Sequence, residues 1–328
     1  MIRIPKFPVR TVVAGAFVAL TAASLSAQDA DPAADPAIVV TTLGTGAPIL
    51  SPDRYSQSIL VEAGEHRLLF DTGRGAVVRL AQAGVSPASI EEVFFTHYHS
   101  DHTVGFGDFW LMSWLPAGGA RKVPLNVTGP TGIEALIEGH RIAFADDIRI
   151  RVADQNLPPE GTEIDVTSFD QPGVVFDEGG VVVTAFESDH GDEITPNYGY
   201  SIEYQDHTVV ISGDTKKDDR VAEVAKGADL LLHSVGAARP ELAAKPPIQL
   251  ILAHHTLPHE AGEIFAAAAP KMAALTHLVL LGRPGIPPLS TEELVSMTRE
   301  TYDGPLVVAE DLMRFEIGDD VIVTPPEQ

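Results

Sequence analysis

The stretch THYHSDHT, residues 96–103, places three histidines and one aspartate within six positions, directly after the apolar run VFF. Side chains two positions apart in an extended chain point the same way, so His97 and His99 can reach one metal ion. Asp101 and His102 lie where the chain turns toward the next helix, and they can reach a second ion. A purely structural cluster is disfavoured, because so many polar groups without partners cost free energy. The stretch therefore predicts a metal centre at the end of a strand.

The composition limits the kind of metal and the kind of partner. The chain has 328 residues and no cysteine, which excludes disulfides, thiol nucleophiles and cysteine-ligated zinc. Histidine and carboxylate ligands favour two Zn²⁺ ions, with Mn²⁺ or Fe²⁺ as alternatives. The 46 acidic residues outnumber the 22 basic ones, giving a net charge of −24. Such a surface repels polyanions, so we expect a small-molecule anionic ester as substrate and no nucleic acid as partner.

The N-terminal residues have the pattern of an export signal. Three basic residues precede the apolar run TVVAGAFVALTAASL, and the small residues Ser26 and Ala27 follow it. The run is short for a membrane span, which needs about 20 residues, so no stable membrane insertion is expected after cleavage. We expect a periplasmic or secreted protein. A homodimer is compatible with the sequence. The expected parts are a signal peptide at 1–27, a flexible segment at 28–36 and a single hydrolase domain at 37–328.

The remainder of the chain alternates between strand and helix patterns. Short β-branched runs that end in turns predict strands, which begin near residues 37, 56, 66, 92, 181, 198, 207, 228, 273 and 305. Helices are predicted at 74–84, 102–115, 131–145, 217–226, 258–269 and 291–301. Two alternating halves of this kind predict an α/β layered domain with two sheets. The polar, turn-rich segment 149–180 predicts an excursion between the halves.

The HxHxDH motif of residues 97–102 resembles that of the metallo-β-lactamase fold superfamily. This resemblance implies a four-layered αβ/βα sandwich, with two mixed β-sheets flanked by helices. It also implies that Asp71, in LLFDTG, supports the ligands from behind. The metal ligands implied by the resemblance are His97, His99, Asp101, His102, His190 (in FESDHGD), Asp214 (in VVISGDT) as the bridging carboxylate, and His277 (in ALTHLVL).

A narrower resemblance is to the ribonuclease Z-like branch, which includes zinc arylsulfatases and related phosphodiesterases. The segments LGTGAP, YGYSIEY, DLLLHSV and HTLPHEAGEIF carry it. It implies that His255 serves the leaving group, with Thr256 capping the following helix; the alternative makes His255 a metal ligand and His277 a core histidine. Asp101 and His255 are the candidate catalytic residues. Ser234 follows His233 where the family usually has glutamate, and this departure weakens the case for the full ribonuclease Z mechanism.

These observations predict an exported dinuclear zinc hydrolase that cleaves an aryl sulfate or phosphodiester through a hydroxide bridging the two ions. The alternatives are a ribonuclease Z-like endonuclease acting on tRNA 3′ ends, and a lactone or β-lactam hydrolase. Export and the negative charge place the tRNA alternative second. Trp110 and Trp114 are expected in the core rather than in an aromatic substrate pocket. Lys216 and Lys217 are expected to be a solvated pair rather than contacts to an anionic ester.

Overall fold

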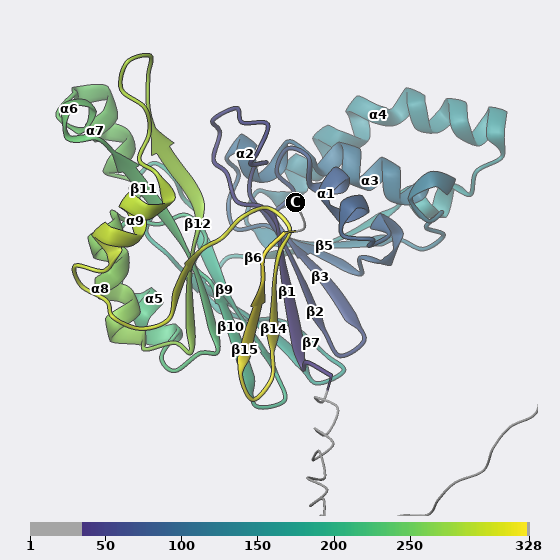
Figure 1. Ribbon diagram of the computed structural model, residues 1–328. Helices are drawn as coiled ribbons and strands as arrows, with labels where there is room; N and C mark the ends of the chain where they lie inside the picture. The colour runs from purple at the N-terminus through teal and green to yellow at the C-terminus, as the bar shows by residue number, and fades with distance from the viewer. Residues whose placement is uncertain (1–34, 327–328) are drawn as a thin grey trace, which may run out of the picture. The chain divides into compact units, whose positions relative to one another are not determined.

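Two mixed β-sheets pack face to face in the computed structural model, which describes residues 35–326 (Figure 1). The predicted signal peptide and most of the predicted flexible segment lie outside the described residues. The domain boundaries and the periplasmic or secreted location therefore stay predictions. None of the helices described combines the length and the apolar character needed to cross a membrane.

The first sheet has the strand order β15-β14-β1-β2-β3-β4-β5-β6. Strands β15 to β3 along this order pair antiparallel, whereas β3 to β6 pair parallel. The bounds are β1 Ile38–Gly44, β2 Ser58–Ala63, β3 His66–Phe70, β4 Glu92–Phe94, β5 Leu125–Pro130, β6 Ile164–Phe169, β14 Met313–Ile317 and β15 Val321–Thr324.

The second sheet has the strand order β13-β12-β11-β10-β9-β8-β7. Strands β10 to β13 pair parallel, and β7 to β10 pair antiparallel. The bounds are β7 Gly173–Glu178, β8 Val181–Glu187, β9 Tyr198–Tyr204, β10 His207–Ile211, β11 Leu230–Ala238, β12 Met272–Leu281 and β13 Leu306–Val308.

Helices cover the outer face of each sheet. The α-helices are α1 Ala76–Gln82, α2 Ser100–Thr103, α3 Phe106–Trp114, α4 Ile133–Gln155, α5 Asp219–Val224, α6 Pro240–Ala243, α7 Pro246–Leu252, α8 Pro258–Ala268 and α9 Thr291–Thr298, and the short 3₁₀ helices are Pro87–Ser89, Pro116–Gly118 and Pro159–Thr162. One apolar core lies between the sheets, a second under α1, α3 and α4, and a third under α5, α8 and α9. The predicted four-layered sandwich is confirmed.

The predicted excursion at 149–180 is wrong. Helix α4 continues to Gln155, and β6 and β7 each form an edge strand of one sheet. The end of α4 is polar: Arg151 Nε lies 2.9 Å from Asp147 Oδ2, and Arg149 Nε lies 3.2 Å from Asp146 Oδ1. Such pairs stabilise an exposed helix without producing an apolar period, so the pattern could not predict its length.

Candidate metal centre

The predicted ligands come from segments that follow parallel strand ends. The HxHxDH segment follows β4, His190 follows β8 and Asp214 follows β10. In the first sheet β4 runs parallel to β3, and in the second sheet β8 and β10 run in the same direction, since each is antiparallel to β9. The carboxyl ends of these strands therefore lie at one edge of each sheet. His277 lies within β12, where that strand reaches the same edge. The fold thereby gathers residues that are up to 180 positions apart in the sequence.

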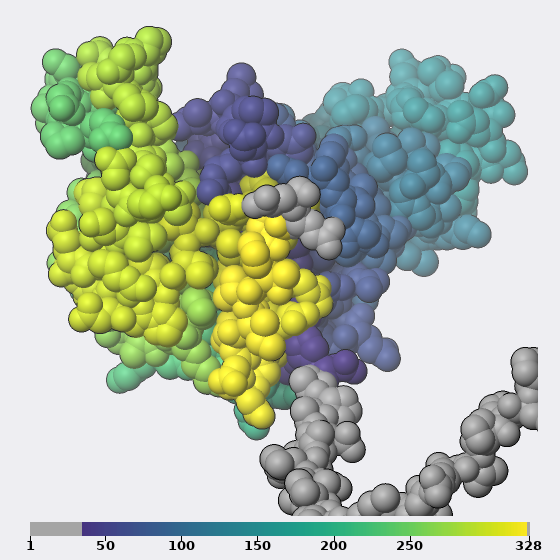
Figure 2. Space-filling model, in the orientation of Figure 1, coloured from purple at the N-terminus to yellow at the C-terminus, as the bar shows by residue number. Residues whose placement is uncertain are grey.

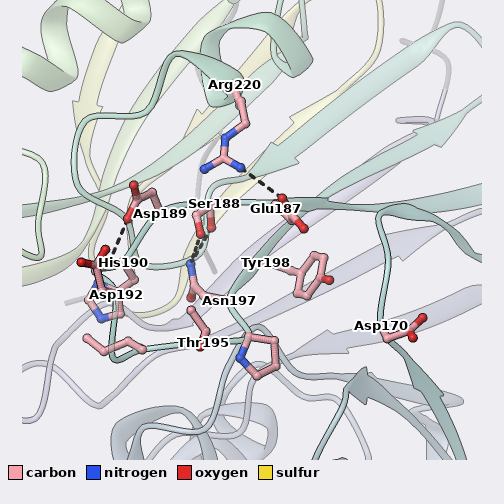
Figure 3. A pocket seen from close by; sticks show the side chains of 13 residues that line it. Asp170, Glu187, Ser188, Asp189, His190, Asp192, Thr195, Asn197, Tyr198 and Arg220 are labelled. Atoms are coloured by element: carbon pink, nitrogen blue, oxygen red, sulfur yellow. Dashed lines mark hydrogen bonds and ion pairs between the residues drawn. The ribbon is translucent and has the colours of Figure 1, made fainter.

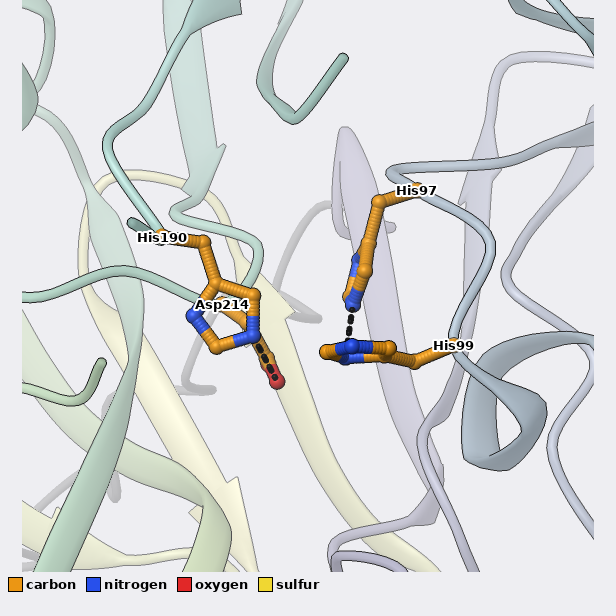
Figure 4. Close-up of side chains that lie close together, drawn as sticks. All are labelled: His97, His99, His190 and Asp214. Carbon is orange, nitrogen blue, oxygen red and sulfur yellow. Dashed lines mark hydrogen bonds and ion pairs between the residues drawn. The ribbon is translucent and has the colours of Figure 1, made fainter. Parts of the chain in front are cut away.

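One group of potential ligands consists of His97, His99, His190 and Asp214, with one ligand atom from each lying within 4.8 Å of the others. His97 Nε2 lies 3.0 Å from His99 Nδ1, and His190 Nε2 lies 3.7 Å from Asp214 Oδ2 (Figure 4). Three imidazoles and a carboxylate within this distance form a donor set suited to zinc.

A second group consists of Asp101, His102 and His277. His277 Nε2 lies 3.1 Å from Asp101 Oδ2 and 3.2 Å from His102 Nε2. Asp214 adjoins this group as well, because its Oδ1 lies 3.2 Å from His277 Nδ1. Asp214 is therefore the carboxylate that touches both groups, which is the place that the resemblance implied for a bridging ligand.

A β-bulge presents His277 to this site. Ser234 on β11 pairs with Thr276 and Val235 pairs with Leu278, so His277 has no partner on that strand. Its φ of +42° is a left-handed conformation that is costly for a residue with a side chain. A bulge redirects one side chain out of the alternating pattern of a strand. The alternative that made His277 an ordinary core histidine does not agree with this placement beside two carboxylates.

Unsatisfied buried atoms test whether these residues fit a metal. His190 Nε2, His277 Nδ1 and Asp214 Oδ1 are buried and make no hydrogen bond. Buried polar atoms normally have partners, and divalent cations at the two ligand groups would supply them. The residues therefore fit a pair of divalent ions, as is typical of enzymes with this fold, and the donor chemistry favours zinc without fixing its identity.

Burial and neighbouring carboxylates shift the pKa values of the ligand histidines in different directions. Burial opposes a charge on His102, but Asp214 and Asp71 outweigh it and raise the pKa of His102 well above its usual value. Burial lowers the pKa of His97 well below its usual value, and the pKa values of His99 and His190 are lowered for the same reason.

Contacts behind the ligands fix their orientation. Asp71 Oδ2 lies 2.7 Å from His102 Nδ1, and Asp71 Oδ1 accepts a hydrogen bond from the Thr96 backbone N–H at 2.9 Å. His190 Nδ1 lies 2.8 Å from the backbone oxygen of His254, so it carries the proton and leaves Nε2 free. Such contacts select the ring tautomer that a metal needs. Asp71 thus lies where the resemblance implied a supporting carboxylate.

His255 lies beside the ligands, and its place leaves both interpretations of it open. It forms a third group of potential ligands with Asp214 and His277. Its Nδ1 is buried without a partner. The predicted cap is wrong, because the Thr256 hydroxyl donates to the backbone oxygen of Thr215 and helix α8 begins after Leu257, whose N–H is bound by Glu260.

The other predicted residues lie outside the two ligand groups. Trp110 and Trp114 are buried, and their indole N–H groups donate to the backbone oxygens of Thr162 and Pro158, which confirms their place in the core. His233 is buried against Phe265, with its ring centroid 5.9 Å from that of the phenylalanine. Ser234, at the position where the family usually has glutamate, accepts a hydrogen bond from the Thr215 N–H at 3.3 Å.

Asp311 is a residue that the sequence did not single out. It is 5% exposed, and its Oδ1 accepts hydrogen bonds from the Thr45 N–H and hydroxyl at 2.9 and 2.8 Å. Its Oδ2 binds the Arg79 guanidinium at 3.0 Å and the Tyr55 N–H at 2.7 Å. The backbone oxygen of Thr45 in turn accepts a hydrogen bond from the N–H of Leu278 at 2.8 Å. Asp311 therefore fixes the loop that holds the bulge at His277.

We predict that Asp311→Asn weakens binding of the second metal ion by about 10- to 100-fold, as is typical when a contact behind a ligand is lost. The first ion should bind as in the wild type, because Asp311 contacts none of its ligands. Titration with Co²⁺, followed by visible absorption, measures the two steps separately. Asp229→Asn is the control, because Asp229 is 4% exposed and precedes β11 at the opposite end of the sheet. Equal two-step titrations for Asp311→Asn and the wild type would contradict the prediction.

The fold and the two ligand groups define a class of protein, the metal-dependent hydrolases of the metallo-β-lactamase type. A profile of the Beta-lactamase superfamily domain matches residues 66–278 of the chain. This range contains all seven predicted ligands and His255.

The chain also has relatives over nearly its whole described length. It is 35% identical to ribonuclease Z of Mycobacterium bovis (strain BCG / Pasteur 1173P2), an alignment that covers 85% of this chain and 98% of the relative. It is 34% identical to ribonuclease Z of Mycobacterium marinum, with coverage of 85% and 99%. The chain therefore belongs to the metallo-β-lactamase superfamily and, within it, to the ribonuclease Z-like branch.

Solved structures show the same fold. A metallo-β-lactamase fold protein from Bacillus subtilis superposes with a TM-score of 0.64 at 21% identity, covering 85% of this chain and 99% of that one. The short form of human tRNase Z superposes with a TM-score of 0.60 at 21% identity, with the same coverage.

These relatives correct two predictions. The expected hydrolase of an aryl sulfate or a small phosphodiester is wrong, because the relatives that share about a third of the residues of this chain are ribonucleases. The expectation of a small-molecule substrate without nucleic acid is wrong for the same reason. Both rested on the net charge of −24 and on export. A net charge averages over the whole surface, whereas a substrate responds to the local potential near the site.

Proposed function

We propose that the protein is a metal-dependent endoribonuclease of the ribonuclease Z type, which cleaves the 3′ end of precursor tRNA. The observation that carries the proposal is the identity of 35% to a ribonuclease Z over 98% of that relative's length. The groups of potential metal ligands support it, since bound divalent ions would neutralise the negative charge of the phosphodiester that is cleaved.

The residues that would hold the ions are His97, His99, His190 and Asp214 for one, and Asp101, His102, His277 and Asp214 for the other. Bound divalent ions lower the pKa of water and neutralise charge on a phosphate. The protein orients the rings through Asp71 and the His254 backbone oxygen. These contacts hold the ligand nitrogens toward the site before a substrate arrives.

Two side chains are suited to proton transfer. Burial opposes the charge on Asp101, but the hydrogen bond from His277 and the charge of His102 outweigh it and lower its pKa. Asp101 is therefore a carboxylate at neutral pH and can accept a proton from the attacking water. His255 can donate to the departing 3′ oxygen of the RNA, because its ring lies beside Asp214 and its Nδ1 is unpaired.

Cleavage of a 3′-extended precursor tRNA by the purified, zinc-loaded full chain tests the proposal. We expect one cut at the 3′ end of the tRNA body, lost in the presence of a chelator and restored by added zinc. A gel that resolves the released trailer measures it, with an unrelated single-stranded RNA of the same length as control. Failure to cut the precursor, with both metal ions bound, would refute the proposal.

A further inference from the structure

Two cavities flank the site, and their linings carry opposite charge. One, of about 440 Å³, includes His190 and is lined by four carboxylates against one arginine (Figure 3). The charged residues that line it are Asp170, Glu187, Asp189, Asp192 and Arg220. A phosphate chain would meet repulsion there.

The second cavity, of about 530 Å³, includes His255 and lies between α7, α8 and the segment after β10. Two lysines, Lys216 and Lys217, line it against one carboxylate, Glu260. Three further cavities within residues 35–326 each have two carboxylates against one arginine. Among the five, the cavity beside His255 is thus the one in which cations outnumber carboxylates.

The lysines are able to change partners. Lys216 Nζ lies 3.0 Å from Asp189 Oδ2, and Lys217 pairs with Glu263. All four side chains are roughly 40% exposed, with values of 40, 38, 39 and 43%. Exposed pairs of this kind contribute little to stability, so a phosphate can replace either carboxylate.

His255 connects this cavity to the ligand groups. It is 9% exposed and lines the cavity, and its Nδ1 has no partner. It also lies with Asp214 and His277 in one of the groups of potential ligands. An RNA phosphate in the cavity would therefore lie directly beside the site that acts on the neighbouring phosphodiester.

Resting on the proposed function, we propose that the cavity between α7 and α8 binds the phosphate groups of the single-stranded RNA next to the scissile bond, through Lys216 and Lys217. The bound strand extends from the site through this cavity and not through the cavity with four carboxylates. The location also gives a chain of net charge −24 a way to hold a polyanion, because two exposed lysines beside the site can exchange Asp189 and Glu263 for phosphate groups.

The test compares the wild type with the double variant Lys216→Gln/Lys217→Gln and with the control Lys226→Gln. Lys226 is an exposed lysine in the turn after α5, and it lines none of the five cavities. Binding of a labelled octamer of 2′-O-methyl RNA to the zinc-loaded full chain is measured by anisotropy between 50 and 200 mM salt. Gel analysis of the octamer checks that it stays intact.

The double variant should bind roughly tenfold more weakly, and its plot of log affinity against log salt should be shallower by about 1.4, since each phosphate contact on a single strand contributes about 0.7. Lys226→Gln should keep the wild-type slope. The proposal is overturned if the double variant keeps that slope, or if Lys226→Gln loses as much. A wild type that fails to cut precursor tRNA but shows these differences refutes the proposed function alone.

Discussion

Asp214→Ala is expected to lose both metal ions as a stable pair and to lose activity by at least roughly 10³-fold. The reason is its position: Oδ2 lies 3.7 Å from His190 Nε2, and Oδ1 lies 3.2 Å from His277 Nδ1. Asp214 is ionised at neutral pH, because His277 and His102 outweigh the cost of burial and hold its pKa well below the usual value. Bound metals contribute several kcal/mol to the transition state, and each 1.36 kcal/mol corresponds to a tenfold change in rate.

Metal analysis after dialysis, together with cleavage of precursor tRNA, measures both effects in the same preparation. Asp229→Ala is the matched control: it also removes a buried carboxylate, one that pairs with Lys271 at 2.7 Å far from the ligands. The control should lose stability and keep two ions per chain. Two ions and normal turnover in Asp214→Ala would remove this residue from the site.

The HxHxDH part of the predicted ligand set follows a local rule, because His97, His99 and His102 lie together in the sequence and their chemistry is visible without a structure. Asp214 and His277 lie far from this motif, and only the resemblance to the superfamily assigned them as ligands. The strand ends that gather them are predictable from the alternating pattern. The positive φ of His277 was not predictable, since a bulge in β12 depends on its partner strand β11 and leaves no mark on the sequence.

The contacts around Asp311 could not be predicted for a related reason. They join Thr45, Tyr55 and Arg79 to a residue more than 200 positions away. Each of these side chains alone has the ordinary appearance of a surface polar residue. Similarly, Thr256 does not cap α8, because its hydroxyl donates to the backbone oxygen of Thr215 in the segment after β10, and the propensity of threonine for a helix start cannot reveal that partner.

The comparison with relatives shows where a sequence average misleads. The excess of 24 negative charges predicted repulsion of RNA, and it is a correct statement about the mean surface. The relatives nevertheless cover 85% of the chain and are ribonucleases. A net charge does not describe the few charges beside the ligands, and Lys216 and Lys217 become notable only when the fold places them in one cavity with His255.

His277→Ala and His255→Ala are expected to differ in kind. His277 contacts Asp101 and Asp214 at 3.1 and 3.2 Å, so its loss should remove the second metal ion. His255 is unpaired at Nδ1 and lines the cavity that is proposed to bind RNA phosphate groups. Its loss should therefore leave both ions in place and reduce the rate. Proton donation to a leaving group typically contributes 10²- to 10⁴-fold.

The protonation of His255 sharpens this prediction. Burial lowers its pKa to about 3, so the ring is neutral at pH 7 before the substrate binds; the negative charge of a bound phosphate raises this pKa, so that the ring takes up a proton from water and can then donate it to the leaving oxygen. Loss of such a donor matters less when the leaving group is stable as an anion. His255→Ala should therefore lose far more activity on precursor tRNA, whose leaving group is an alkoxide, than on a nitrophenyl phosphodiester. Metal counts for both variants separate the two roles: if His255→Ala loses an ion while His277→Ala retains two, the roles must be exchanged, and the unpaired Nδ1 of His255 is then the ligand atom.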